Sequence, residues 1–187
     1  MKKNICALLV IDMQQVAFDG KITPPFPNAS QLLDKITNLI EICRGEKIPI
    51  IYIQTCNPIP GEPYSKEAHG WEIHERIAPQ DEDVVVFKEN SSSFDGSDLH
   101  KVLSDLAVES LIMCGGWSEF CVASSVKDAL SHSYQVCLAA DGHSTVSDDE
   151  EKSRVIIARQ NAVFAELGAS VVEISNLHDH LIAQKLV

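Results

Sequence analysis

The sequence predicts a single α/β domain, a three-layer sandwich in which a mostly parallel six-stranded sheet carries helices on both faces. Short apolar runs rich in β-branched residues alternate along the chain with longer segments of helical period. This alternation is typical of parallel sheets, whose strands are buried on both faces. A length of 187 residues with 45% hydrophobic content suits one core, so residues 1–187 are interpreted as one domain.

The apolar runs place the six strands, and the segments between them place the helices. We expect strands at residues 7–11, 48–53, 83–87, 110–113, 135–139 and 170–174. The first helix begins after Asn28, which can cap it while Gln31 reaches back, and it continues to Gly45. A later helix begins near Asp148 and ends before Gly168.

Residues 55–81 do not follow the alternation. The segment is rich in proline and glycine, but it also contains the aromatic residues Tyr64 and Trp71. Long irregular loops in compact domains are usually functional or disordered, and the aromatic residues argue against disorder. Open α/β sheets bind ligands at the carboxyl ends of their strands. We therefore interpret residues 55–81 as a covering loop over a crevice at that edge.

Charge and composition exclude several classes of partner. A formal charge of −12 and a pI near 4.9, without clustered Lys and Arg, argue against nucleic acid. No apolar stretch approaches the roughly 20 residues of a membrane span. Met1 leads through three polar residues into an apolar run without a cleavage site, so we expect a cytoplasmic protein. Its partner is expected to be a small-molecule substrate.

Six cysteines could suggest disulfides, but their positions favour free thiols. Cys6, Cys114 and Cys137 lie in apolar runs, where cysteine behaves as a small hydrophobic residue, and there is no C-x-x-C spacing. Cys121 differs because it follows a turn after the fourth run and is expected to open a helix. The positive end of a helix lowers a thiol pKa, which favours the reactive thiolate.

Two further candidates share the edge of the sheet with Cys121. Asp12 follows the first apolar run and Lys88 follows the third. Taken singly, an aspartate at a strand end is more often a turn residue and a lysine more often a solvated charge. Their occurrence at strand ends together with Cys121 instead favours a catalytic site that combines a carboxylate, an ammonium and a thiol.

The same residues lie in motifs that resemble a known superfamily. Residues 8–14 (LLVIDMQ), 88–94 (KENSSSF) and 115–122 (GGWSEFCV) resemble, in order, the signature blocks of the isochorismatase-like cysteine hydrolases. Residues 127–129 and 141–145 are also similar. The superfamily includes nicotinamidases, N-carbamoylsarcosine amidohydrolases, ureidoacrylate amidohydrolases and isochorismatases, which share a Rossmann-like α/β fold.

The resemblance implies a role for each site residue. Cys121 would be the nucleophile, Asp12 the base that takes its proton, and Lys88 the cation that holds the pair. The backbone N–H groups of Trp117 and Cys121 would form the oxyanion hole, next to a cis peptide bond between Gly116 and Trp117. Gly116 stands where the family usually has a branched residue.

The resemblance also bears on metal and substrate binding. Metal-dependent nicotinamidases carry an Asp-x-His pair after the second strand, where this chain has residues 54–58 (QTCNP). His69 and His74, without a carboxylate, would make a poor metal site, so we expect neither metal nor organic cofactor. The Trp117 indole would either wall the crevice or pack against a neighbouring subunit. The expected substrate pocket consists of Gln14, Phe18, Trp71, His74, Trp117 and Phe120.

These inferences predict a metal-independent cysteine amidohydrolase. It would cleave a C–N bond of a small amide, N-carbamoyl or ureido substrate through a thioester-type acyl-enzyme, as a homodimer or homotetramer like other family members. One alternative is a catalytically silent binding module on the same fold. The other is the vinyl-ether hydrolysis of isochorismatase, which the cysteine disfavours. Nucleotide binding is a weaker hypothesis because G-x-G-x-x-G spacing is absent.

Overall fold

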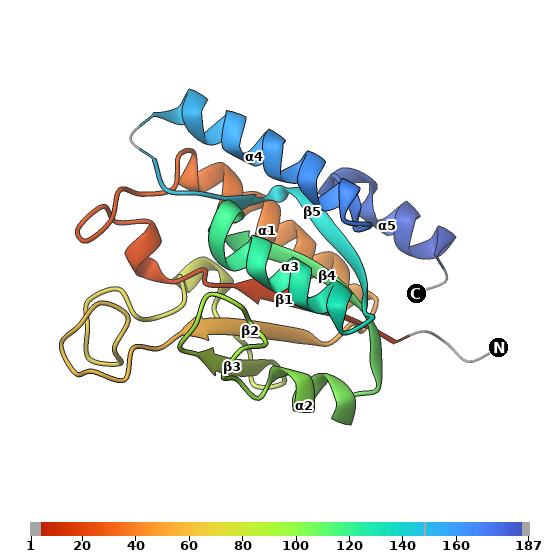
Figure 1. Ribbon diagram of the computed structural model, residues 1–187, viewed down its shortest axis with the longest axis horizontal. Helices are drawn as coiled ribbons and strands as arrows, with labels where there is room; N and C mark the ends of the chain where they lie inside the picture. The colour runs from red at the N-terminus through yellow and green to blue at the C-terminus, as the bar shows by residue number, and fades with distance from the viewer. Residues whose placement is uncertain (1–4, 148, 185–187) are drawn as a thin grey trace.

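The structure, a computed structural model, describes residues 5–147 and 149–184 and contains one six-stranded sheet (Figure 1). All its strands run parallel, in the order β3-β2-β1-β4-β5-β6, so the predicted sheet is confirmed and is wholly parallel. The strands are β1 (Ile5–Ile11), β2 (Ile50–Thr55), β3 (Val84–Lys88), β4 (Val108–Gly116), β5 (Gln135–Ser144) and β6 (Ser170–Val172). The α-helices are α1 (Ala29–Gly45), α2 (Leu99–Asp105), α3 (Ala123–Ser131), α4 (Glu150–Glu166) and α5 (Ile174–Ala183).

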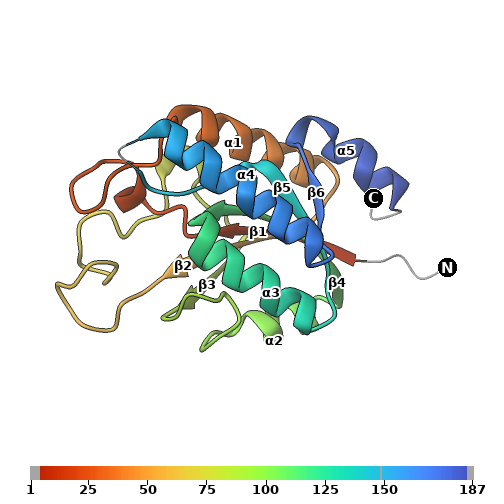
Figure 2. The ribbon, with the colours of Figure 1, turned by 45° about the horizontal axis from the view of Figure 1, so that its top comes forward.

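The helices form the two outer layers of the predicted sandwich (Figure 2). Alternate residues of a strand point to opposite faces of the sheet. On β1, Leu8 and Val10 pack with α1 and α5, whereas Leu9 and Ile11 pack with α2, α3 and α4. All four side chains are at most 1% exposed. Burial on both faces explains why the strands are continuous apolar runs in the sequence.

Several element boundaries differ from the prediction. Strands β4 and β5 extend beyond their apolar runs to Gly116 and Ser144, whereas residue 174 opens α5 instead of ending a strand. Asn28 precedes α1 in a left-handed conformation (φ 53°) and its side chain makes no capping hydrogen bond, so the predicted cap is wrong. Asp148 lies outside the described residues, and Asp149 caps α4 by accepting hydrogen bonds from two backbone N–H groups.

The chain leaves β1 toward β2 on one side, whereas β4 lies on the other side of β1. Such a reversal of strand order opens a crevice at the carboxyl ends of the strands. Gly115 lies at this point, with a φ of 127° and so little space that a Cβ atom would stand 2.1 Å from the Ile11 carbonyl oxygen. Only glycine permits β4 to pass β1 this closely.

Residues 55–81 and 12–28 form long connections beyond the carboxyl ends of the strands (Figure 1). They contain only short 3-10 helices, η1 (Gln15–Ala17) and η2 (Glu75–Ile77). Backbone bonds join the two connections, with Gln15 N donating to Glu72 O at 2.8 Å and His74 N to Met13 O at 2.9 Å. No described helix is long and apolar enough to cross a bilayer.

Candidate active site

Asp12, Lys88 and Cys121 meet at the carboxyl edge of the sheet. Asp12 follows β1, Lys88 ends β3, and Cys121 lies in η3 (Ser118–Val122), a turn of π-helix between β4 and α3. Lys88 Nζ lies 2.8 Å from Asp12 Oδ2 and 3.4 Å from Cys121 Sγ. The structure thus brings together the three side chains that the sequence predicted to converge.

Asp12 is held by both the backbone and side chains. It has a positive φ of 51° and is 0% exposed. Its backbone N–H donates to Ile53 O at 2.9 Å, and its Oδ1 accepts a hydrogen bond from Thr55 Oγ1 at 2.9 Å. A buried carboxylate is costly unless it is paired and hydrogen-bonded. The contacts from Thr55 and Lys88 meet that requirement, one at each carboxylate oxygen.

Lys88 is 1% exposed, and carbonyl groups surround its ammonium. Nζ donates to Asn90 O at 3.0 Å and to Ser91 O at 3.2 Å. The chain therefore turns back over the lysine directly after β3. Ser93 fixes this turn because its backbone N–H donates to Ser125 Oγ of α3 at 2.9 Å. The serine-rich motif after Lys88 thus builds the cavity that holds the buried charge.

The state of Cys121 differs from the sequence prediction. Cys121 is the fourth residue of η3, so it does not open a helix, and Val122 N bonds to Trp117 O in the wide π-type turn at 3.1 Å. The pKa of the half-buried thiol is raised to about 12, mainly by burial and then by the charge of Asp12, while Lys88 acts in the opposite direction. The prediction of a lowered pKa is wrong, because desolvation outweighs the helix field.

The predicted cis peptide bond is also wrong. The bond between Gly116 and Trp117 is trans. A non-proline cis bond costs about 3 kcal/mol, and the trans bond avoids that cost. A Cβ atom on Gly116 would lie 2.4 Å from Phe26 Cζ, which explains why glycine replaces the branched residue usual in the resembling family. The roles of the Trp117 and Cys121 backbone N–H groups as oxyanion donors stay predictions.

A buried chain of hydrogen bonds supports η3 and was not foreseen. Asn161 Nδ2 donates to Ala140 O at 2.9 Å, so its Oδ1 faces His143 Nε2 at 2.8 Å and accepts from it. His143 Nδ1 is then an acceptor for Ser118 Oγ at 2.8 Å. Burial lowers the pKa of His143, which favours this neutral imidazole. Because Ser118 begins η3, we infer that the chain holds the turn that carries Cys121.

Gln14 occupies a different place from the one predicted. It is 0% exposed. Its Nε2 donates to Thr55 O and Trp71 O, and its Oε1 accepts from Thr55 N at 3.0 Å. With its amide satisfied inside the protein, Gln14 ties Thr55 to the long connection instead of lining a substrate pocket. Thr55 was missed by the sequence analysis, although its pairing with Lys88 across β2 and β3 could have revealed it.

Aromatic side chains form a continuous row beside the site. Trp117 packs edge-on against Phe26 at 5.3 Å and Tyr64 at 6.2 Å between ring centroids, and Phe26 contacts Phe18 at 5.4 Å. Phe18 in turn packs against His74 at 4.7 Å. The Trp117 indole therefore packs within this chain, between the buried Phe26 and the long connection that contains Tyr64.

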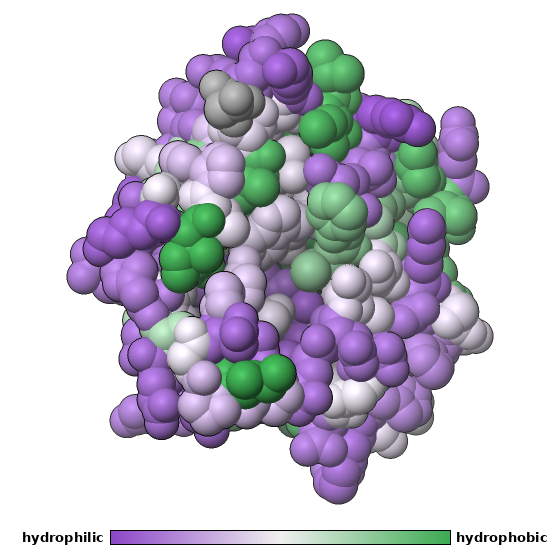
Figure 3. Space-filling model, turned by 60° about the vertical axis from the view of Figure 1, so that its left-hand side comes forward, coloured by the Kyte–Doolittle hydropathy of each residue, from purple (hydrophilic) through white to green (hydrophobic). Residues whose placement is uncertain are grey.

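The two remaining predicted pocket residues lie outside this row. Trp71 stacks on Phe87 with ring centroids 5.9 Å apart, and Phe120 is 59% exposed. Viewed onto the carboxyl edge, the surface is hollowed near its centre, with separate hydrophobic groups among polar ones (Figure 3). Ile22, Ile59 and Phe120 are exposed hydrophobic residues from segments at this edge. A small, partly apolar substrate suits such a surface.

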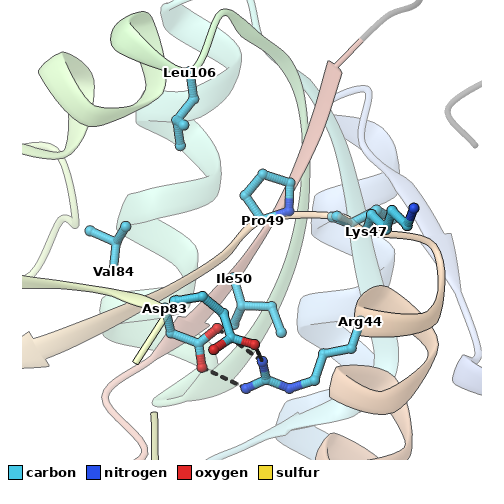
Figure 4. Close-up of a pocket in the computed structure, with 9 residues that line it drawn as sticks. Arg44, Lys47, Pro49, Ile50, Asp83, Val84 and Leu106 are labelled. Atoms are coloured by element: carbon cyan, nitrogen blue, oxygen red, sulfur yellow. Dashed lines mark hydrogen bonds and ion pairs between the residues drawn. The ribbon is translucent and has the colours of Figure 1, made fainter. Parts of the chain in front are cut away.

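A cavity of about 410 Å³ lies away from the catalytic groups (Figure 4). It adjoins Ile50 and Val84, the first residues of β2 and β3, and so opens at the amino ends of the strands. Arg44 binds Asp83 there through two contacts, of 3.2 Å and 2.5 Å. The residues that line it include no cysteine, serine or histidine. The carboxyl edge is therefore the candidate site.

The described residues do not cluster as metal ligands do. Within residues 5–147 and 149–184, no group of three or more His, Cys, Asp or Glu side chains is placed to hold a metal ion. His69 pairs with Asp19, and His74 Nδ1 accepts from Arg76 N at 3.3 Å, so the two histidines serve separate local contacts. Metal independence stays a prediction that chelation can test.

The chain is similar to known proteins of one family. The model of the isochorismatase domain matches residues 6–170. A streptothricin hydrolase of Streptomyces noursei is 31% identical over 139 residues, which cover 74% of this chain and 49% of that protein. An N-carbamoylsarcosine amidase of Arthrobacter sp is 24% identical over 126 residues, which cover 58% of this chain and 48% of that protein. The chain thus spans about half the length of these relatives.

A solved structure resembles the whole chain. A cysteine hydrolase from Pseudomonas syringae pv. phaseolicola superposes with a TM-score of 0.86 at 20% sequence identity. The match covers 98% of this chain and 95% of that one. At this identity the likeness supports the fold.

Proposed function

The chain belongs to the isochorismatase family of hydrolases, and we propose that it is a metal-independent cysteine hydrolase that cleaves a C–N bond. The substrate would be a small amide, N-carbamoyl or ureido compound. The observation that carries this proposal is the group formed by Asp12, Lys88 and Cys121, with Nζ 2.8 Å from Oδ2 and 3.4 Å from Sγ. A cation in contact with both a base and a nucleophile is an arrangement that can activate a thiol.

The raised pKa of Cys121 determines the order of events. Because the thiol is protonated at neutral pH, it must lose its proton as the substrate arrives. Asp12, whose charge acts on the thiol, accepts that proton while sulfur attacks the carbonyl carbon. The carbonyl electrons move to oxygen, and the resulting oxyanion is stabilised by hydrogen-bond donors, for which the Trp117 and Cys121 backbone N–H groups are our candidates.

The collapse of this intermediate completes acylation. The carbonyl re-forms, the C–N bond breaks, and the leaving nitrogen takes the proton from Asp12. A thioester-type acyl-enzyme stays on Cys121. A water molecule then gives a proton to Asp12 and attacks the acyl carbon, and the thiol recovers that proton as the acid or carbamate leaves. Lys88 keeps a positive charge beside the sulfur and the carboxylate throughout, which stabilises whichever of them is negative.

The test is ammonia release from a panel of small amides, N-carbamoyl amino acids and ureido acids. We expect wild-type protein to hydrolyse at least one class, and acid quenching during turnover should trap an acyl group on the peptide that contains Cys121. Cys121→Ala should abolish both signals, whereas Cys56→Ser should leave both unchanged. Activity that persists in Cys121→Ala contradicts the proposal. A fully negative panel with intact ligand binding favours a silent binding module.

A further inference from the structure

Tyr64, in the connection formed by residues 55–81, is directed toward the catalytic groups. Its ring packs edge-on against Trp117, the residue that precedes η3. The pKa of Tyr64 is raised to about 12, mainly by burial and then by the charges of Asp12 and Cys121, which affect neither of the other two tyrosines. The contact with Trp117 thus places the ring beside the turn that carries Cys121, and the two charge effects agree with that position.

The backbone holds Tyr64 in an unfavourable conformation. Its φ is 69°, in the left-handed region, which costs a residue with a side chain roughly 1 kcal/mol. The Tyr64 carbonyl accepts a hydrogen bond from Asn57 N at 3.0 Å, which fixes this conformation. Such strain concentrates at functional sites, where the surrounding structure enforces it. From this conformation the Tyr64 ring meets Trp117.

The hydroxyl of Tyr64 has no protein hydrogen-bond partner among the described residues, and it is not one of the fully buried polar atoms. It is therefore free to donate a hydrogen bond to a ligand that enters beside Trp117. Because the phenol stays protonated at neutral pH, it can donate but does not supply a negative charge. An oxygen of a bound ligand would satisfy it.

We propose that the Tyr64 hydroxyl donates a hydrogen bond to the acyl oxygen of the substrate while Cys121 attacks the acyl carbon. This inference rests on the proposed function and adds a catalytic residue to it. The proton stays on Tyr64, because Asp12 is the group that takes the thiol proton. The hydrogen bond strengthens as charge develops on the oxygen, so it acts mainly on the transition state.

The first test compares Tyr64→Phe with Tyr134→Phe as a matched control. Tyr134 contacts His100 at 3.3 Å, at the amino end of β5, far from the site. We expect Tyr64→Phe to lower kcat/KM by about 10- to 100-fold, chiefly through kcat, and Tyr134→Phe to leave it unchanged. Because the Tyr64 hydroxyl has no partner, its removal should leave the Tm unchanged or slightly higher. A large fall in Tm would show a structural partner and overturn the premise.

The second test does not depend on amide cleavage. Butyraldehyde should add reversibly to Cys121, with sulfur bonding to the carbonyl carbon and the thiol proton passing through Asp12 to the oxygen. The affinity of this hemithioacetal is measured by its protection of Cys121 from iodoacetamide. We expect Tyr64→Phe to weaken the protection by about tenfold, because the oxygen loses its donor.

The outcomes separate the two proposals. If no amide is cleaved but Tyr64→Phe weakens the aldehyde adduct, the proposed C–N hydrolysis fails and the role of Tyr64 stands. If amides are cleaved but Tyr64→Phe matches wild type in both assays, the role of Tyr64 fails and the hydrolase stands. Absence of any aldehyde adduct on wild-type Cys121 also overturns the role of Tyr64.

Discussion

Replacing Asp12 with asparagine should make Cys121 more reactive toward alkylation while abolishing turnover. After burial, the charge of Asp12 is the main cause that raises the pKa of Cys121, and an amide removes the charge. The thiolate fraction therefore rises. The same substitution removes the proton acceptor, so we expect kcat to fall by roughly 100-fold or more. A substitution that merely damages the site would lower both rates.

The pKa of Cys121 sets how strongly its alkylation rate depends on pH and on Asp12. With a pKa of about 12, roughly one Cys121 in 10,000 is a thiolate at pH 8, compared with about one in ten for a thiol at the ordinary value of 9.0. Labelling of wild type should therefore rise nearly tenfold per pH unit from pH 7 to 10. Asp12→Asn should accelerate it at pH 8, by at most about 1,000-fold if the whole pKa shift disappeared.

The assay follows iodoacetamide labelling of the peptide that contains Cys121, in a Cys56→Ser background that removes another partly exposed thiol. Lys88→Met is the diagnostic companion: because Lys88 lowers the pKa of Cys121, its loss should slow labelling and turnover together. Asp19→Asn is the matched control, because it removes the charge of a carboxylate that pairs with His69 and takes no part in the catalytic group. A plateau in wild-type labelling below pH 8, or slower labelling in Asp12→Asn, would refute the reasoning.

Three other outcomes are expected. Thr55→Val removes the donor to Asp12 Oδ1 and should lower kcat by about 10- to 100-fold, whereas Thr55→Ser should retain activity. Activity should survive exhaustive EDTA treatment, and its recovery only with zinc, iron or manganese would contradict metal independence. Burial raises the pKa of thiols such as Cys114 and Cys137, so the folded state keeps protons that the unfolded chain loses above pH 9. The free energy of unfolding, measured by urea titration, should therefore fall as pH rises from 8.5 to 10.5, by up to about 1.4 kcal/mol per thiol per pH unit, and less steeply in Cys137→Ala.

The apolar runs of the sequence were enough to predict the parallel sheet and the three catalytic candidates at its carboxyl edge. Strands buried on both faces must be apolar along their whole length, so β1 to β5 were recognisable, although their ends were not. Parallel strands end at a common edge. The places of Asp12, Lys88 and Cys121 after the first, third and fourth apolar runs were therefore enough to predict that they meet.

The contacts within the long connections could not be predicted from the sequence. Gln14 was predicted to line the substrate pocket and Thr55 was not singled out, yet the two bond to each other, and Thr55 holds Asp12 in place. Tyr64 meets Trp117 from a strained backbone conformation that no local pattern signals. Segments without periodic burial leave no hydrophobic pattern, so only the folded chain shows which of their side chains reach the site.

The chemical state of the nucleophile shows the same division. The sequence placed Cys121 after β4 and suggested a helix field that would lower its pKa. In the folded chain the pKa of Cys121 is raised instead. Desolvation depends on every group that surrounds the sulfur, and the charges of Asp12 and Lys88 reach it from distant parts of the chain. The electrostatic field of one helical turn can be inferred from the local sequence. Burial depends on the whole fold, and here it has the larger effect on the pKa of Cys121.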